Sequence, residues 1–133
     1  MKVLLSIKPE FADKIFSGEK KYEYRKVIFA QKGVKTIVVY STMPIGKIIG
    51  EFEIEEILQS DPSSIWKETK DFSGIKSSFF NEYFHGRSVA YAIKVKNATL
   101  YSEPIIPTDI IDNFFAPQSF RYLHAYNQLE IAY

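Results

Sequence analysis

The sequence predicts a mixed α+β fold, in which several strands build a curved or closed antiparallel sheet and a few helices cover its ends. Segments in which apolar and polar residues alternate recur along the chain, as expected of strands that are buried on one face. Shorter segments with apolar residues at helical spacing lie between them, bounded by proline and glycine. A chain of 133 residues has the size of one domain, so we expect residues 1–133 to form a single domain.

Proline, glycine and aspartate mark the boundaries of the predicted elements. Pro9 suits the first turn of a helix, and Gly18 supplies the left-handed residue that ends it. Asp61 and Pro62 combine a capping side chain with a first-turn proline and begin a second helix. We predict strands over residues 3–7, 20–26, 36–40, 48–58, 87–96 and 100–106, with a turn at Asn97 between the last two. We predict helices over residues 9–17 and 61–70 and around 79–84, a helical turn over 108–114, and a closing strand or helical tail over 129–133.

The charge balance and the absence of cysteine exclude several classes of function. Seventeen basic and sixteen acidic residues leave a formal charge of +1, so the field of the whole chain would not hold a long polyanion. Without cysteine there is no disulfide, no thiolate metal site and no cysteine nucleophile. His85 and His124 lack the spacing of paired ligands, and we predict no metal and no cofactor. No stretch approaches the roughly 20 apolar residues that span a bilayer, so we expect a cytoplasmic protein without membrane contact; nothing in the sequence indicates an oligomeric state.

The segment from Gly18 to Arg25 is the most informative one for function. A glycine that turns the chain from helix to strand is followed closely by Lys20, Glu23 and Arg25. The forked guanidinium and the ammonium suit a phosphate or a planar carbonyl, while the carboxylate can orient either cation or accept from a base amino group. The combination predicts a ligand-recognition site in a single polar cleft. The alternative is a solvated strand face held by salt bridges.

The same segment fits the pattern G-x-K-x-x-E-x-R, and the chain resembles bacterial and archaeal proteins of the ASCH domain family over nearly its whole length. Further segments carry the likeness: Leu5-Ser6-Ile7-Lys8-Pro9, Tyr40-Ser41-Thr42-Met43-Pro44, Ile49-Gly50-Glu51-Phe52 and Pro117-Gln118-Ser119-Phe120. The resemblance implies a β-barrel of the PUA-like superfamily, with a cleft beside the first helix. It also implies a partner, namely RNA, another single-stranded nucleic acid or a modified nucleoside.

The resemblance implies two kinds of catalysis. Some ASCH proteins cleave RNA through a tyrosine, a lysine and a serine, for which Tyr40, Lys47 and Ser119 are the nearest candidates here. Another branch removes the acetyl group of N4-acetylcytidine with a lysine-activated threonine. Lys20 matches that lysine, but Glu23 occupies the position of the threonine, and a carboxylate cannot replace the hydroxyl nucleophile. That amidohydrolase mechanism is therefore disfavoured, unless Glu23 activates water while Lys20 polarises the amide.

Other polar residues extend the candidate site. Ser41 ends a predicted strand before a Pro-Gly loop, a position from which side chains often reach a cleft. Gln118 and Ser119 can bond a base edge, Phe120 can stack on a base, and Arg121 can meet a phosphate. The alternative for this cluster is a rigid loop that closes the barrel.

A predicted helix carries an aromatic stripe, consisting of Phe79, Phe80, Tyr83 and Phe84. Such a stripe can stack on bases, but at helical spacing it more often belongs to the core. We therefore interpret it as core.

Three functions are compatible with the sequence. The first is an RNA- or nucleotide-binding module, with a role in RNA metabolism or in the regulation of transcription or translation, whose cleft is lined by Lys20, Glu23, Arg25, Tyr40, Lys47 and Ser119. The second is an enzyme that acts on RNA or on a modified nucleoside. The third is a protein-interaction adaptor, which a large exposed apolar patch away from the cleft would favour.

Overall fold

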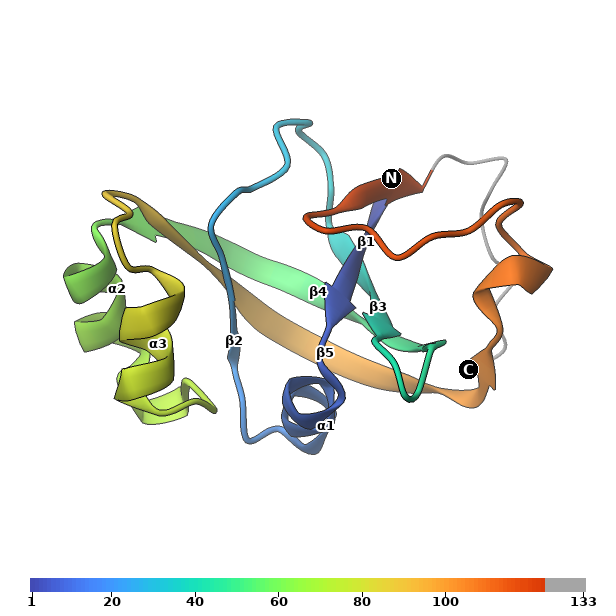
Figure 1. Cartoon of the computed structure of the whole chain (residues 1–133), viewed down its shortest axis with the longest axis horizontal. Coiled ribbons are helices and arrows are strands. Elements are labelled where there is room, and N and C mark those ends of the chain that lie inside the picture. The colour runs from blue at the N-terminus through green and yellow to red at the C-terminus, as the bar shows by residue number, and fades with distance from the viewer. Residues whose placement is uncertain (124–133) are drawn as a thin grey trace.

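The computed structural model describes residues 1–123, so the predictions for His124 and for residues 129–133 lie outside it. Six strands form one sheet in the order β2-β5-β4-β3-β1-β6 (Figure 1). The strands are β1 (Lys2–Ile7), β2 (Tyr22–Arg25), β3 (Thr36–Ser41), β4 (Lys47–Ser60), β5 (Ala90–Ile105) and β6 (Arg121–Leu123). The helices are α1 (Pro9–Ser17), α2 (Pro62–Thr69) and α3 (Ser77–Tyr83), with short 3-10 turns η1 (Lys70–Phe72) and η2 (Pro107–Asp109).

The sheet confirms the predicted α+β class but corrects its topology. β1 and β3 pair in parallel, whereas every other pairing among the described strands is antiparallel. A parallel pair needs a long crossover connection, and α1, β2 and the loop after β2 supply it. β2 and β6 are the edge strands, and no ladder joins them within residues 1–123, so the structure does not confirm a closed barrel.

Asn97 lies in a bulge within one strand, so the predicted turn between two strands is wrong. β5 runs without interruption from Ala90 to Ile105, and Asn97 adopts a φ of 49° inside it. The register between β4 and β5 shifts at this point, between the pairs Glu51–Thr99 and Glu53–Lys96, which is typical of a β-bulge. The Asn97 side-chain amide donates to Glu53 Oε2 at 2.6 Å across the ladder. The left-handed residue therefore bends the strand instead of ending it.

The helix boundaries follow the local signals of the sequence. α1 begins at Pro9 and ends before Gly18, whose φ is 87°. α2 begins at Pro62, and Asp61 caps it by accepting the backbone N–H of Ser64 at 3.0 Å. None of the helices in the described part of the chain is long and apolar enough to cross a membrane.

The aromatic stripe of α3 divides between the core and the surface. Phe80 and Phe84 are buried and pack with Tyr24 and Ile65 in an apolar cluster beneath α2 and α3. Phe79 is 36% exposed, and Tyr83 is half-buried. The core interpretation of the stripe is thus confirmed for two rings only. The rings of Phe79 and Tyr83 line a pocket between α1, β2 and α3.

Candidate functional site

A pocket of about 230 Å³ opens between α1, β2 and α3. It lies below the roughly 300–1,000 Å³ of pockets for drug-sized ligands, so its size suits one planar ring or a similar group. Its walls include four aromatic rings, namely Phe11, Tyr24, Phe79 and Tyr83. Its polar lining includes Lys20, Glu23, Arg25 and Gln118. Four residues that the sequence predicted as site residues therefore meet at one concave surface.

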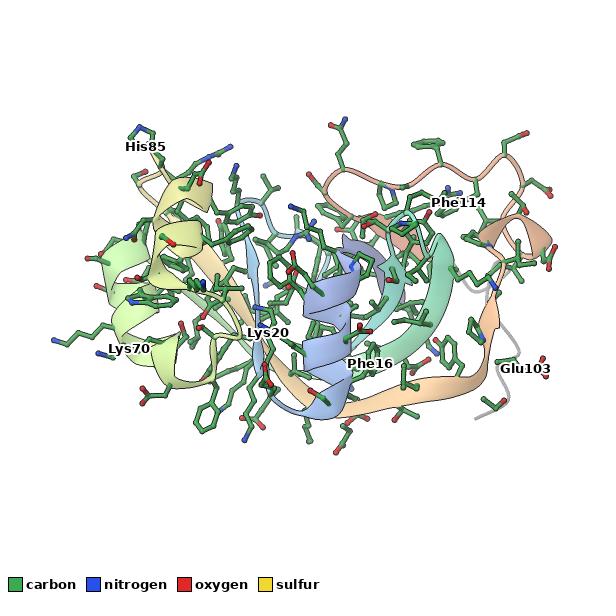
Figure 2. All side chains as sticks on the ribbon, turned by 60° about the horizontal axis from the view of Figure 1, so that its bottom comes forward. Phe16, Lys20, Lys70, His85, Glu103 and Phe114 are labelled. Atoms are coloured by element: carbon green, nitrogen blue, oxygen red, sulfur yellow. The ribbon has the colours of Figure 1, made fainter. Side chains whose placement is uncertain are left out.

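Lys20 is a buried cation at this pocket, with only 2% of its surface exposed. Figure 2 shows it beside α1, on the side that faces the other two helices. Its Nζ donates to the backbone carbonyl of Ser73 at 2.6 Å and lies 4.6 Å from the centre of the Tyr24 ring. Gly74 follows with a φ of +67°, and a Cβ there would fall 2.6 Å from Lys20 Cβ. Only glycine lets the loop after η1 close this tightly over the lysine stem.

Burial changes the protonation of Lys20. Desolvation lowers the pKa of its ammonium from 10.5 to about 8, although the nearby Glu23 carboxylate acts in the opposite direction. A lysine with this pKa can both donate and accept a proton near neutral pH, which an ordinary lysine cannot. The site thus combines a cation for a carbonyl or phosphate with an amine that can take part in proton transfer.

The guanidinium of Arg25 forms hydrogen bonds with other groups of the protein. Its Nη1 lies 3.3 Å from Glu23 Oε2 and also donates to the backbone carbonyl of Ser6 at 3.3 Å. Its Nη2 donates to the backbone carbonyl of Ser119. Glu23 is itself 7% exposed, so the carboxylate and the guanidinium neutralise each other in a site with little water.

The same contacts hold Gln118 at the pocket. Ser6 Oγ donates to the carbonyl of Pro117 at 2.8 Å, and Arg25 holds the carbonyl of Ser119. The two anchored carbonyls flank Gln118, whose side chain lines the pocket. Within this segment, the side chain of Gln118 lines the pocket, whereas Ser119 contributes its backbone carbonyl.

The remaining candidates lie elsewhere. Tyr40, Ser41, Lys47 and Arg121 do not line the pocket, which corrects the expectation of one cleft that contains them all. Tyr40 is buried in a different apolar cluster, with its ring centre 5.1 Å from that of Phe114. Ser41 is buried and pairs with the exposed Lys47 where β3 and β4 meet. Arg121 lies in the edge strand β6 opposite Leu4.

Several residues that line the pocket or hold its lining in place escaped the sequence analysis. For Phe79 and Tyr83 a signal existed, because four aromatic positions on one short helix span a wider arc than a single core-facing stripe needs. For Ser73 no signal existed, since its contact with Lys20 uses the backbone carbonyl. Among residues 1–123, no group of three or more histidine, cysteine or acidic side chains is placed to hold a metal ion.

The fold and the pocket define an α+β protein with an open mixed sheet and a small, partly charged cavity beside its first helix. The family model of the ASCH domain matches residues 5–99, which include the whole segment from Lys20 to Arg25. The chain belongs to the ASCH domain family.

Individual relatives agree with this assignment. An ASCH domain-containing ribonuclease of Zymomonas mobilis is 30% identical over 126 residues, covering 90% of this chain and 82% of the relative. The crystal structure of ASCH from Zymomonas mobilis matches with a TM-score of 0.88 and 29% identity, over 95% of this chain and 90% of that chain. Structures of its tyrosine-to-phenylalanine and serine-to-alanine variants match with TM-scores of 0.88 and 0.87. Large ribosomal subunit protein uL22 of Ureaplasma parvum is 31% identical over 103 residues, which are 77% of this chain but 33% of that protein.

The buried Lys20 predicts an unusual pH dependence of stability. Its pKa is about 8 in the folded chain and 10.5 when solvated, so between these values the unfolded chain binds more protons and the free energy of unfolding rises with pH. Relative to Lys20→Met, the wild type should gain about 1.4 kcal/mol per pH unit from about pH 8 to 10. Urea denaturation at several pH values measures the difference.

The gain ends near pH 10 because Lys20 of the unfolded chain then loses its own proton, with a pKa of 10.5. Burial also raises the pKa of Tyr24 to about 12, which makes stability fall at higher pH, but both proteins carry Tyr24, so its effect cancels from the difference. Lys67→Met is the control, since it removes a lysine from an exposed site on α2. Its difference from the wild type should stay constant. A constant difference for Lys20→Met as well would contradict the prediction.

The Arg25 contacts predict a local effect on the segment around Gln118. Lysine in place of Arg25 keeps the charge but cannot reach the Glu23 carboxylate and two carbonyls together. Arg25→Lys should therefore raise amide hydrogen exchange in a peptide that covers residues 117–123, with little change in α2. Arg87→Lys, at an exposed position, should leave both peptides unchanged. Equal exchange in the two variants would show that Arg25 does not hold this segment.

Proposed function

We propose that this chain binds RNA or a nucleotide by taking one base into the pocket between α1, β2 and α3. The observation that carries the proposal is the buried Lys20, held between aromatic rings beside the Glu23 carboxylate. Burying a cation is costly, and a protein keeps such a group most often where it has a function. The pocket volume of about 230 Å³ matches one base better than a longer ligand.

The polar groups of the pocket complement the edge of a base. The Lys20 ammonium can donate to a ring carbonyl, and the Glu23 carboxylate can accept from an exocyclic amino group. Gln118 offers a carboxamide that both donates and accepts, and it is exposed at the pocket. Aromatic rings such as Phe11 and Tyr24 supply surfaces for the flat faces of the base. In this proposal Arg25 positions Glu23 and Gln118 and does not itself bind phosphate.

The net charge of +1 supports selective capture of a small element over binding along a long backbone. The finer expectations belong to the same proposal: a PUA-like relationship, a cytoplasmic location, a modified nucleoside as ligand and a role in regulating RNA metabolism. Each of them rests on the family and on the sequence.

Binding measurements test the pocket. A panel of short RNAs, single-stranded DNAs and normal or modified nucleosides is titrated at low salt against wild type, Lys20→Met, Gln118→Ala and the control Lys67→Met. We expect at least one tight ligand, about tenfold weaker binding to Lys20→Met and to Gln118→Ala, and no change for Lys67→Met. Gln118 is exposed, so its variant tests the pocket even if Lys20→Met is unstable. Absence of any ligand, or equal binding by all variants, would refute the proposal.

A ribonuclease is the second candidate, and the relative from Zymomonas mobilis, named as a ribonuclease and 30% identical, favours it. The residues proposed for this chemistry are Tyr40, Lys47 and Ser119. A tyrosine could relay protons, and a lysine could stabilise the negative charge that develops on phosphorus. The Tyr40 side chain lies near the turn after β3, because a Cβ added at Gly46 would be 3.8 Å from its hydroxyl, and Lys47 follows that turn.

Cleavage assays separate this candidate from binding alone. Labelled single-stranded RNA is incubated with wild type and with Tyr40→Phe, Lys47→Ala and Ser119→Ala, each of which should lower the rate by about 100-fold. Lys67→Ala should cleave like the wild type and so excludes a contaminating nuclease. N4-acetylcytidine serves as a second substrate, with Lys20→Met as its variant. If the wild type turns over neither substrate, or if the variants match it, the protein is not this enzyme.

A further inference from the structure

Two aromatic rings of α3 lie at the opening of the pocket. Phe79 and Tyr83 are one helical turn apart, and their ring planes differ by only 11°, with centres 6.4 Å apart. Both line the pocket, and Phe79 is exposed, so it lies at the rim. Two nearly parallel rings offer a flat ligand the same orientation at either position.

A lysine from a different element covers each of these rings. Lys8, just before α1, places its Nζ 5.6 Å from the centre of the Phe79 ring. Lys26, just after β2, places its Nζ 4.6 Å from the centre of the Tyr83 ring. Neither lysine forms an ion pair within residues 1–123. The rim therefore carries two cations whose charge the described part of the chain leaves unneutralised.

These contacts are easily exchanged for contacts with a nucleotide. An exposed cation over an aromatic ring is bound weakly, whereas a base stacks on the same ring more strongly. A lysine displaced by the base can swing on its flexible stem and meet the phosphate of that nucleotide. Together the rings and their lysines match the two parts of a nucleotide, the base and the phosphate.

The charges around the rim also indicate a direction. A neighbouring groove shares Phe79 with the pocket, and Glu10 and Glu82 line it together with two lysines. Glu10 and Glu82 offset the positive charge of those two lysines, whereas Lys8 and Lys26 have no ion-pair partner among the described residues, so a phosphate backbone gains more beside Lys8 and Lys26. A strand leaving the pocket is therefore favoured along Lys8 and Lys26.

We propose that Lys8, Lys26, Phe79 and Tyr83 form a second subsite that binds the nucleotide next to the base in the pocket, so that the ligand is a single strand and not a free nucleoside. This inference rests on the proposed function, since it places the neighbouring nucleotide relative to a base in the pocket. The inference adds that the ligand is longer than one nucleoside, and it names the residues that contact the backbone of the ligand.

The test compares nucleosides with homopentamers of the same four bases as RNA, bound to wild type and to four variants at several salt concentrations. The pentamer should bind at least tenfold more tightly than its nucleoside. The double variant Lys8→Gln with Lys26→Gln should remove most of that advantage, change nucleoside binding much less, and reduce the slope of log affinity against log salt by about 0.7 per lysine. Phe79→Leu should weaken the pentamer by about tenfold, with a smaller effect on the nucleoside.

The matched control is Lys67→Gln with Lys70→Gln, which removes two exposed lysines from the region of α2. If the pentamer and the nucleoside bind equally, or if the two double variants behave alike, the second subsite is wrong while the base pocket stands. If pentamers bind through Lys8 and Lys26 but Lys20→Met has no effect, the base pocket is wrong and the rim alone binds. If neither ligand binds, both proposals are wrong.

Discussion

The burial of Lys20 is the constraint on which the pocket depends. Its ammonium bonds the carbonyl of Ser73, and its stem packs against Gly74, so it joins the start of β2 to the loop before α3. Both segments contribute lining residues to the pocket, Lys20 and Glu23 from the first and Ile75 from the second. Because desolvation lowers the pKa of the amine, the contact that shapes the site also sets its chemistry.

The cations near the pocket look equivalent in the sequence but have different roles in the structure. Arg25 bonds the Glu23 carboxylate and two backbone carbonyls and fixes the position of Gln118, while Lys8 and Lys26 lie over the rings of Phe79 and Tyr83 without an ion-pair partner in residues 1–123. A buried, planar guanidinium suits a structural role because it satisfies several acceptors at once. Flexible lysines at a rim suit exchange with a ligand.

The candidate residues for the two kinds of chemistry implied by the family lie in different parts of the structure, except for Ser119, whose backbone carbonyl bonds Arg25 at the pocket. The pocket with Lys20 adjoins the apolar cluster of α2 and α3, whereas Tyr40 packs in the cluster with Phe114 near the ends of β3 and β4. A protein can bind RNA at one place and cleave it at another if a single RNA strand reaches both places. This separation makes the length of the ligand the central question about function.

Local signals in the sequence determined the class of fold and the ends of α1 and α2, because Pro9, Gly18 and Asp61 act through their own backbone and nearest neighbours. The sequence also identified Lys20, Glu23, Arg25 and Gln118 before any of them could be seen together. Only the tertiary structure decided that β1 and β3 run in parallel, that Asn97 bends a strand, and that Tyr40 lies away from the pocket. These features depend on pairing and packing between segments that are far apart in the chain, which leave no mark on the local pattern of side chains.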